Sequence, residues 1–205
     1  MARARSSLSV LLFGLLFLPA SGAAQLRIVP QAGLYSSVSD LGTVNSSEGV
    51  LDVGENETSL ALGLSLEMNS TGILGLRLTG LYGTDSEVPV GGIGCEGIDC
   101  ELRSTVLGLS ASAVLRPVRS GFPLLPYLVA GGGLKRYDFD FDAESPVGDA
   151  FDDESKLSGV LGLGFDWNLG ILKGNLELVD FISESVLGGE DLQHDFFLTV
   201  GLFLG

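Results

Sequence analysis

Positive charge is scarce in this sequence: Lys and Arg total 11 against 26 Asp and Glu, which gives a formal net charge of −15. A chain with this balance does not bind nucleic acid by neutralising phosphates, so that function class is excluded. The single histidine, His194, is the one that a Ser-His-Asp hydrolase would have to use. Glycine is abundant at 30 residues, but no Gly-X-Y period is present, which excludes a collagen repeat.

Long apolar runs are also scarce, and the one at residues 8–18 has a special context. It follows two arginines and precedes the small residues 20–24. A basic start, an apolar run and a small-residue exit are the three parts of a secretory signal peptide. We expect cleavage after Ala24, so that residues 1–24 are removed and 25–205 form one domain. An uncleaved anchor helix is the alternative, but the run is shorter than the roughly 20 residues that span a membrane.

Beyond this segment, apolar residues recur with a period of two. From Ser59 to Met68, leucines alternate with Ser, Ala, Gly and Glu, as in a strand with two different faces. Similar alternation occurs at 74–83, 107–115, 157–167 and 195–204, and less regularly at 26–36, 125–141 and 172–182. Segments of about 10 residues cross a bilayer as tilted strands. The sequence predicts an all-β fold, an eight-stranded antiparallel up-and-down transmembrane β-barrel.

The composition of the two strand faces predicts which one points outward. One face is almost entirely Leu, Phe and Val, and the other is Gly, Ser, Thr and Ala with scattered charges. A water-facing exterior of Gly, Ala and Ser would be unusual. Leucine facing lipid and small residues in a narrow lumen explain both faces and the many glycines. A soluble lipocalin-like barrel is the alternative.

The connections between these segments alternate in length. The short ones lie near 69–72, 116–124 and 168–171. The long ones, at 36–58, 83–102, 138–155 and 183–195, contain 22 of the 26 acidic residues. Barrels of this kind place short turns on the periplasmic side and long loops outside. We therefore expect one acidic outer rim.

These features resemble the small outer-membrane β-barrel family, the eight-stranded OmpA/OmpX/OmpW-like transmembrane domains of Gram-negative bacteria. The resemblance covers residues 25–205. It depends on the N-terminal signal, the Val-Pro-Gln-Ala-Gly-Leu-Tyr opening at 29–35, the strand at 126–131 and the terminal strand at 195–204. It implies an integral protein of the cell outer membrane and no particular activity. Members often end on an aromatic residue, whereas this chain ends Phe203-Leu204-Gly205.

The expected function is non-enzymatic: the barrel contributes to envelope structure or surface interaction through its long acidic loops. Barrel-fold lipid deacylases carry a His-X-Ser pair, but here Asp195 and Phe196 follow His194. The alternative is a small porin-like channel for ions or small apolar solutes. Expected partners are outer-membrane lipids and lipopolysaccharide, with divalent cations at the acidic rim. No cofactor and no nucleic-acid partner are expected.

Three alternating aspartates are weak metal candidates at this rim: Asp138, Asp140 and Asp142. Their spacing is that of the first three ligands of a calcium loop, but the loop's glycine and its bidentate glutamate are replaced. We expect them to form a solvated rim with loose divalent binding. The aromatic residues that alternate with them are expected to form an interfacial girdle facing lipid: Tyr137, Phe139 and Phe141.

Cys95 and Cys100 are the only cysteines, and they lie in a Gly-rich part of the second long connection. An exported chain meets an oxidising compartment, so we expect these two residues to form a disulfide that stiffens the loop.

Several charged residues fall on the small-residue face and predict a charge network in the lumen: Glu67, Arg77, Asp166, Lys173 and Glu177. A two-residue turn at Leu169-Gly170 would set Asp166 opposite Lys173. A buried ion loses several kcal/mol of solvation unless it is paired, so these groups should find one another. The network either stabilises the barrel alone or also blocks conduction until it rearranges.

Overall fold

The computed structural model describes residues 25–39, 42–46, 49–53, 57–69, 73–92, 101–117, 123–141, 153–185 and 192–203. Its strands are β1 (Gln25–Ser37), β2 (Gly42–Ser46), β3 (Gly49–Val53), β4 (Ser59–Asn69), β5 (Leu74–Gly92), β6 (Glu101–Leu115), β7 (Leu124–Phe141), β8 (Glu154–Leu169), β9 (Leu172–Glu184) and β10 (Leu192–Phe203). No helix in the described part of the chain is long and apolar enough to span a membrane.

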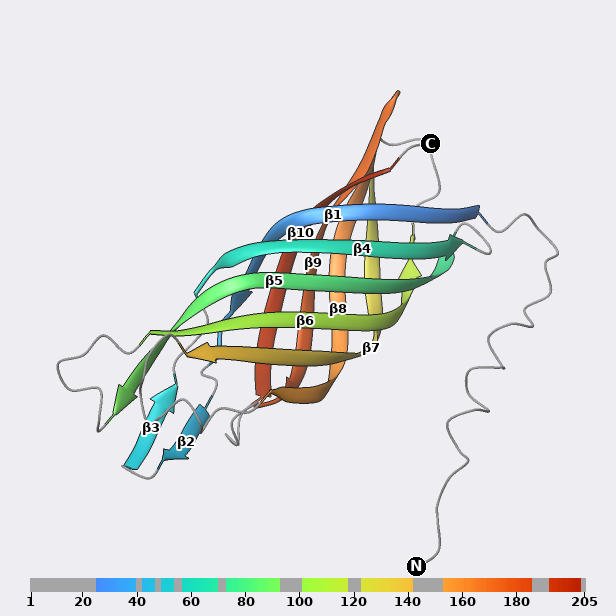
Figure 1. Cartoon of the computed structure of the whole chain (residues 1–205). Helices are drawn as coiled ribbons and strands as arrows, with labels where there is room; N and C mark the ends of the chain where they lie inside the picture. Colours follow the sequence, from blue (N-terminus) through green and yellow to red (C-terminus); the bar gives the residue numbers. More distant parts are fainter. Residues whose placement is uncertain are drawn as a thin grey trace, which may run out of the picture.

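Eight of these strands close into an antiparallel barrel (Figure 1). The strands β4 to β10 pair with their neighbours in chain order, and β1 lies between β4 and β10. Because β1 joins the last strand and β5 pairs with both β4 and β6, the ladder runs round without an edge. The predicted eight-stranded up-and-down barrel is confirmed.

The other two strands, β2 and β3, extend the wall at the end of the barrel that carries the long connections (Figure 1). β3 pairs with β5 at Val53 and Val90, beyond the apolar part of that strand. The prediction that 83–102 is one long loop was therefore wrong, because β5 continues to Gly92 and β6 begins at Glu101. These outer strand segments lack the leucine alternation that marks the others.

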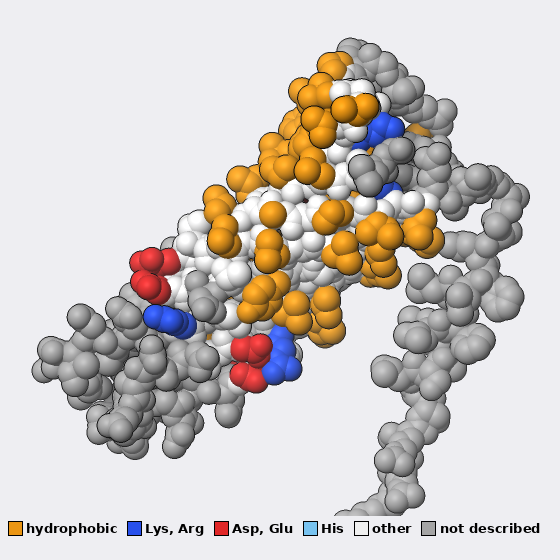
Figure 2. All heavy atoms as spheres, turned by 45° about the horizontal axis from the view of Figure 1, so that its top comes forward, with side chains coloured by type: hydrophobic (Ala, Val, Ile, Leu, Met, Phe, Trp, Pro, Cys, Tyr) orange, Lys and Arg blue, Asp and Glu red, His pale blue; other side chains and the backbone are white. Residues whose placement is uncertain are grey.

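The barrel wall is apolar on the outside (Figure 2), and most of the buried charged and polar side chains lie on its inside. In β4, Leu60 and Leu62 are 65% and 55% exposed, whereas the intervening Ala61 is fully buried. The same strand turns Ser65 and Glu67 inward. A wall of exposed leucines over a buried polar interior suits a lipid environment, as the strand faces predicted.

Large aromatic side chains fill much of the lumen, where the sequence predicted small residues. Five of them are at most 1% exposed: Tyr35, Tyr127, Tyr137, Phe181 and Phe197. Glycines provide the space for several of these rings. A Cβ atom on Gly108 would lie 3.0 Å from the ring of Phe181, and one on Gly164 would lie 2.4 Å from the ring of Tyr127. Many of the glycines are thus explained by aromatic packing inside a narrow barrel.

The β8–β9 hairpin shows where the predicted register was wrong. Leu169 pairs with Leu172, so the two loop residues are Gly170 and Ile171. The predicted loop residues were Leu169 and Gly170. Gly170 has φ of 75°, and type II′ hairpin turns place glycine in the first loop position because it adopts positive φ without strain. This one-residue change in the turn shifts every cross-strand pair by two residues, so each side chain keeps its predicted face.

We predict that Gly164→Ala destabilises the barrel by about 1–3 kcal/mol, because the new methyl group overlaps the Tyr127 ring and the Leu176 carbonyl oxygen, 2.8 Å away. The matched control is Gly132→Ala, where the nearest atom to the new Cβ is 3.8 Å away. Urea unfolding in lipid vesicles measures both variants. Equal stabilities for the two variants would contradict the aromatic-packing role of Gly164.

Candidate functional site

The end of the lumen near the short connections holds six charged side chains, which we call the Glu67 cluster: Arg27, Glu67, Arg77, Arg116, Asp166 and Glu177. They come from β1, β4, β5, β8 and β9 and from the residue that follows β6. Strand alternation turns each of them inward, and the barrel's small diameter brings them together from sites distant in sequence. Three arginines and three carboxylates make the cluster formally neutral.

Glu67 is the centre of this cluster, because all three arginines reach its carboxylate. The Arg77 Nη2 atom lies 2.8 Å from Glu67 Oε2, and the Arg116 Nη1 atom lies 2.7 Å from Oε1. Arg27 is more distant, at 3.5 Å. The Glu67 side chain is fully buried, so these contacts replace its lost hydration.

The other two carboxylates complete the pairing of the arginines. Asp166 lies 2.9 Å from Arg116 and 3.2 Å from Arg27, and Glu177 contacts Arg77 across the lumen. Tyr127 packs between two guanidinium groups, each centred 5.2 Å from its ring. Aromatic faces attract such cations, so the ring adds to the packing of the cluster. The six side chains therefore form one connected network of ion pairs across the lumen.

Moving along the lumen away from this cluster, β4 and β5 next present hydroxyl groups. The hydroxyl of Ser65 donates to Gln31 Oε1 at 3.1 Å and lies 3.1 Å from the Thr79 hydroxyl. Further along the same strands, Ala61 and Leu81 belong to a buried apolar layer with Phe181 and other residues. The lumen therefore changes from ionic to hydroxyl-lined to apolar within a few residues of each strand.

A second buried ion pair lies near the long-connection end, within the Asp195 cluster of Tyr35, Lys135, Tyr137, Gln193 and Asp195. Lys135 contacts Asp195 and donates to the Phe181 carbonyl oxygen at 3.3 Å. The hydroxyls of Tyr35 and Tyr137 both donate to Asp195, the former at 2.8 Å. The side chains of Lys135 and Asp195 are fully buried, and these hydrogen bonds compensate for their lost hydration.

The structure brings together four of the five residues of the expected lumen network: Glu67, Arg77, Asp166 and Glu177. Glu67 and Arg77 are direct cross-strand partners. Lys173 is not among them: it pairs with Asn168, Asp166 pairs with Asn175, and no ion pair reaches Lys173 in the described part of the chain. The predicted Asp166–Lys173 pair was wrong because the turn begins one residue later than expected.

Sequence reasoning missed four charged lumen residues: Arg27, Arg116, Lys135 and Asp195. Asp195 had been counted with the acidic rim, but β10 turns it inward. Their positions share the parity of inward neighbours, such as Gln31 on β1 and Tyr137 on β7. Odd or even position along the strand could therefore have placed these four residues in the lumen, although the leucine alternation around them is weak.

The predicted rim is described only in part. Asp138 is exposed and contacts Arg136 at 2.8 Å, whereas the side chains of Asp140 and Asp142 lie outside the described residues. No metal-holding group of three or more His, Cys, Asp or Glu occurs among the described residues. The predicted lipid-facing girdle was wrong for Tyr137, whose hydroxyl is bound inside the lumen. Cys95 and Cys100 lie outside the described residues.

His194 faces outward near the long-connection end of β10. Its Nδ1 atom lies 2.7 Å from Asp180 Oδ2, and its ring stacks on Phe196. The hydroxyl of Ser39 accepts a hydrogen bond from the His194 backbone N–H and makes none with its imidazole. Among the described residues, His194 and Asp180 thus form a pair without the serine of a Ser-His-Asp triad.

The closed eight-stranded barrel with its apolar wall is the fold of small β-barrels solved from outer membranes. Neisserial surface protein A has a TM-score of 0.52 at 15% identity, over 89% of this chain and 99% of that one. The outer membrane protein OprG from Pseudomonas aeruginosa has a TM-score of 0.55 at 15% identity, over 89% and 95%.

The N-terminal β-barrel domain of Pseudomonas aeruginosa OprF is also similar, with a TM-score of 0.51 at 14% identity over 88% of this chain and 99% of that one. No protein-family model matches the chain, and no curated protein matches it significantly. At these identities the likeness establishes the fold, and the predicted resemblance to small outer-membrane barrels is confirmed at that level.

We predict that Glu67→Gln destabilises the barrel by about 3–5 kcal/mol, because it removes the carboxylate shared by two buried arginines and the partly buried Arg27. The control is Glu184→Gln, at an exposed position on β9 for which the described part of the chain shows no ion pair. Fluorescence of the single tryptophan, Trp167, follows urea unfolding in both variants. A Glu67→Gln barrel as stable as the control would rule out the central role of Glu67.

Proposed function

We propose that this chain is an integral protein of the bacterial outer membrane that acts through its outer rim and contains neither a pore nor a catalytic centre. The observation that carries the proposal is the lumen, which side chains fill with the Glu67 cluster at one end and the Asp195 cluster towards the other. The apolar wall supports the membrane location, because exposed leucines occur on every barrel strand.

The orientation follows from the connections. The turns after β4 and β8 are short, whereas the connections after β5, β7 and β9 and the segment between β1 and β4 are longer and acidic. The connection after β6 is about as long as those after β5 and β9 but contains no acidic residue. Short turns face the periplasm in such barrels. The Glu67 cluster then lies at the periplasmic end and the Asp195 cluster lies nearer the outer surface.

The outer rim supplies the proposed interaction surface. Acidic and basic side chains are exposed at this end of the wall (Figure 2), and Arg136 forms ion pairs of 2.8 Å with Asp138 and 2.7 Å with Asp153. Dense carboxylates attract cations, so divalent ions shared with lipopolysaccharide phosphates are the proposed partners. Envelope structure and surface contact are the roles that such a rim supports.

The alternative of a small channel is less well supported. Ions would have to pass two sets of paired charges and the apolar layer that contains Leu81, Phe181 and Phe197. Desolvating an ion in such a layer costs several kcal/mol even after relaxation. Rearranging the Glu67 cluster alone would leave this layer in place.

We predict that the folded protein in a planar lipid bilayer shows no stable conductance steps, because the Glu67 cluster and the apolar layer around Phe181 both obstruct the lumen. The measurement is made on protein whose insertion is verified by resistance to protease, with lipid alone as the baseline. Reproducible steps from inserted protein would reject the closed-lumen proposal in favour of the channel.

The orientation predicts which epitope tags are accessible on intact cells. A tag inserted after Asp153, which is exposed in the β7–β8 connection, should bind an antibody on intact cells. A tag inserted after Ile171, which is 93% exposed in the β8–β9 turn, should bind only after the outer membrane is permeabilised. The opposite labelling pattern would overturn the topology, and labelling of neither site after permeabilisation would overturn the membrane location.

A further inference from the structure

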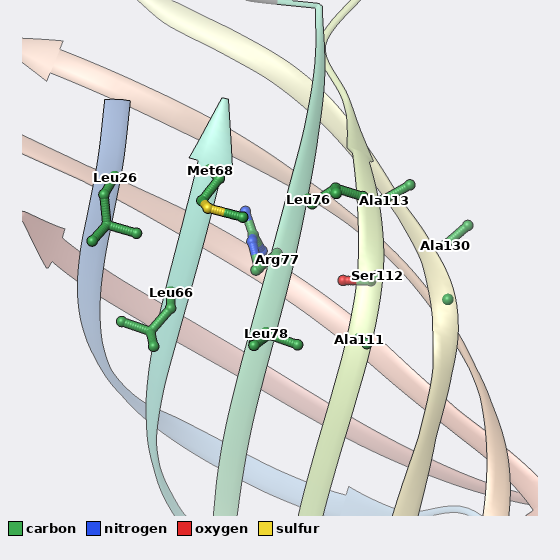
Figure 3. Close-up of a pocket in the computed structure, with 11 residues that line it drawn as sticks. Leu26, Leu66, Met68, Leu76, Arg77, Leu78, Ala111, Ser112, Ala113 and Ala130 are labelled. Carbon is green, nitrogen blue, oxygen red and sulfur yellow. The ribbon is translucent and has the colours of Figure 1, made fainter. Parts of the chain in front are cut away.

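The lipid-facing wall is interrupted by a hollow of about 480 Å³ across β1, β4, β5, β6 and β7 (Figure 3). We call it the wall groove. Leu26, Leu66, Met68, Leu76 and Leu78 border it on one side, and Ala111, Ala113 and Ala130 border it on the other. The groove lies outside the lumen, because these residues belong to the outward-facing set of each strand.

The cross-strand pairs between β6 and β7 explain why the wall is hollow here. Four successive outward-facing pairs are Leu109–Leu134, Ala111–Gly132, Ala113–Ala130 and Leu115–Leu128. Two pairs of small residues thus lie between two pairs of leucines. Each missing leucine side chain lowers the surface, and Leu76 and Leu78 on the neighbouring strand β5 border the groove.

Apolar side chains provide nearly all of the surface of this groove. Its polar lining residues are Arg77 and Ser112, and the hydroxyl oxygen of Ser112 is buried. Arg77 lies at its floor, but the guanidinium group of Arg77 is bound in the lumen by Glu67 and Glu177. An occupant that carries charge or hydrogen-bonding groups would find no partner there and would lose its hydration. The groove therefore suits an alkyl chain.

The shape of the groove argues against a second copy of this chain. A two-fold dimer brings the same surface together from both sides, so a hollow would face a hollow and leave a void. Voids lose dispersion contacts on both of their surfaces. A flexible acyl chain can follow the irregular floor, and the groove is continuous with the apolar belt that faces lipid.

The position of the groove along the strands identifies the leaflet. Its border on β4 and β5 lies beside the short connection between Asn69 and Leu74. In the proposed orientation this is the periplasmic half of the membrane, where phospholipid forms the leaflet. We propose that the wall groove binds one acyl chain of a phospholipid in that leaflet; this inference rests on the proposed membrane location.

The test counts lipids that remain on the folded barrel. The protein is inserted into nanodiscs of palmitoyl-oleoyl phosphatidylethanolamine, transferred to mild detergent and analysed by native mass spectrometry. The parent protein should retain one phospholipid. The double variant Ala111→Leu/Ala113→Leu, which fills the groove with the wall's commonest residue, should lose it.

The matched control is Ala32→Leu, which makes the same change at an outward-facing alanine of β1 outside the groove. This variant should retain the lipid as the parent does. Equal retention by all three proteins would overturn the proposal, and so would a parent dimer that carries no lipid and dissociates in the double variant. Failure of the parent to insert into nanodiscs would instead reject the membrane location itself.

Discussion

Closure of the ladder is the constraint from which the other features follow. Within lipid no water is available to unpaired backbone groups, so a spanning sheet must pair its first and last strands. The β1–β10 pairing achieves this. Once the sheet is closed with eight strands, every side chain either faces lipid or occupies a narrow interior. A charged residue in the spanning region can then avoid lipid only by entering the lumen and finding partners there.

The same constraint explains why ions, hydroxyls and aromatic rings share the interior. A leucine gains little by moving from lipid into the lumen, because both surroundings are apolar. Apolar residues are therefore not needed inside, and polar residues are acceptable wherever their hydrogen-bonding groups are satisfied. Glu67 is neutralised by ion pairs with three arginines, and Asp195 is bound by Lys135 and two tyrosines. The aromatic rings fill the remaining volume above glycines, as Phe181 does at Gly108.

The sequence was sufficient for the eight barrel strands, for most of their faces and for part of the lumen network, because alternation determines parity. It did not predict β2, β3 or the outer part of β5, where leucine alternation is absent. It was not sufficient for the register between β8 and β9. The turn could be Leu169-Gly170 or Gly170-Ile171, and the choice depends on which loop position needs a positive φ. Nor does parity tell which residues meet across the lumen. Arg77 and Glu177 are 100 residues apart and belong to strands that do not pair with each other, so their contact depends on barrel diameter and strand tilt. Tyr137 was misplaced because aromatic residues occur both in lipid-facing girdles and in filled lumens.

If the lumen is closed in two different ways, as the proposed function holds, this restricts where the protein can act. Breaking the ion pairs of the Glu67 cluster would leave the apolar layer around Phe181, and displacing that layer would leave the ionic cluster. A single rearrangement therefore opens no path through the barrel. The surfaces to which the proposed function then assigns activity are the acidic rim and the lipid-facing wall. The wall is not uniform, since Ala113 and Ala130 interrupt its leucines at one place. Both proposals therefore place recognition on the outside of the barrel, with ions and polar surfaces at the rim and an acyl chain along the wall.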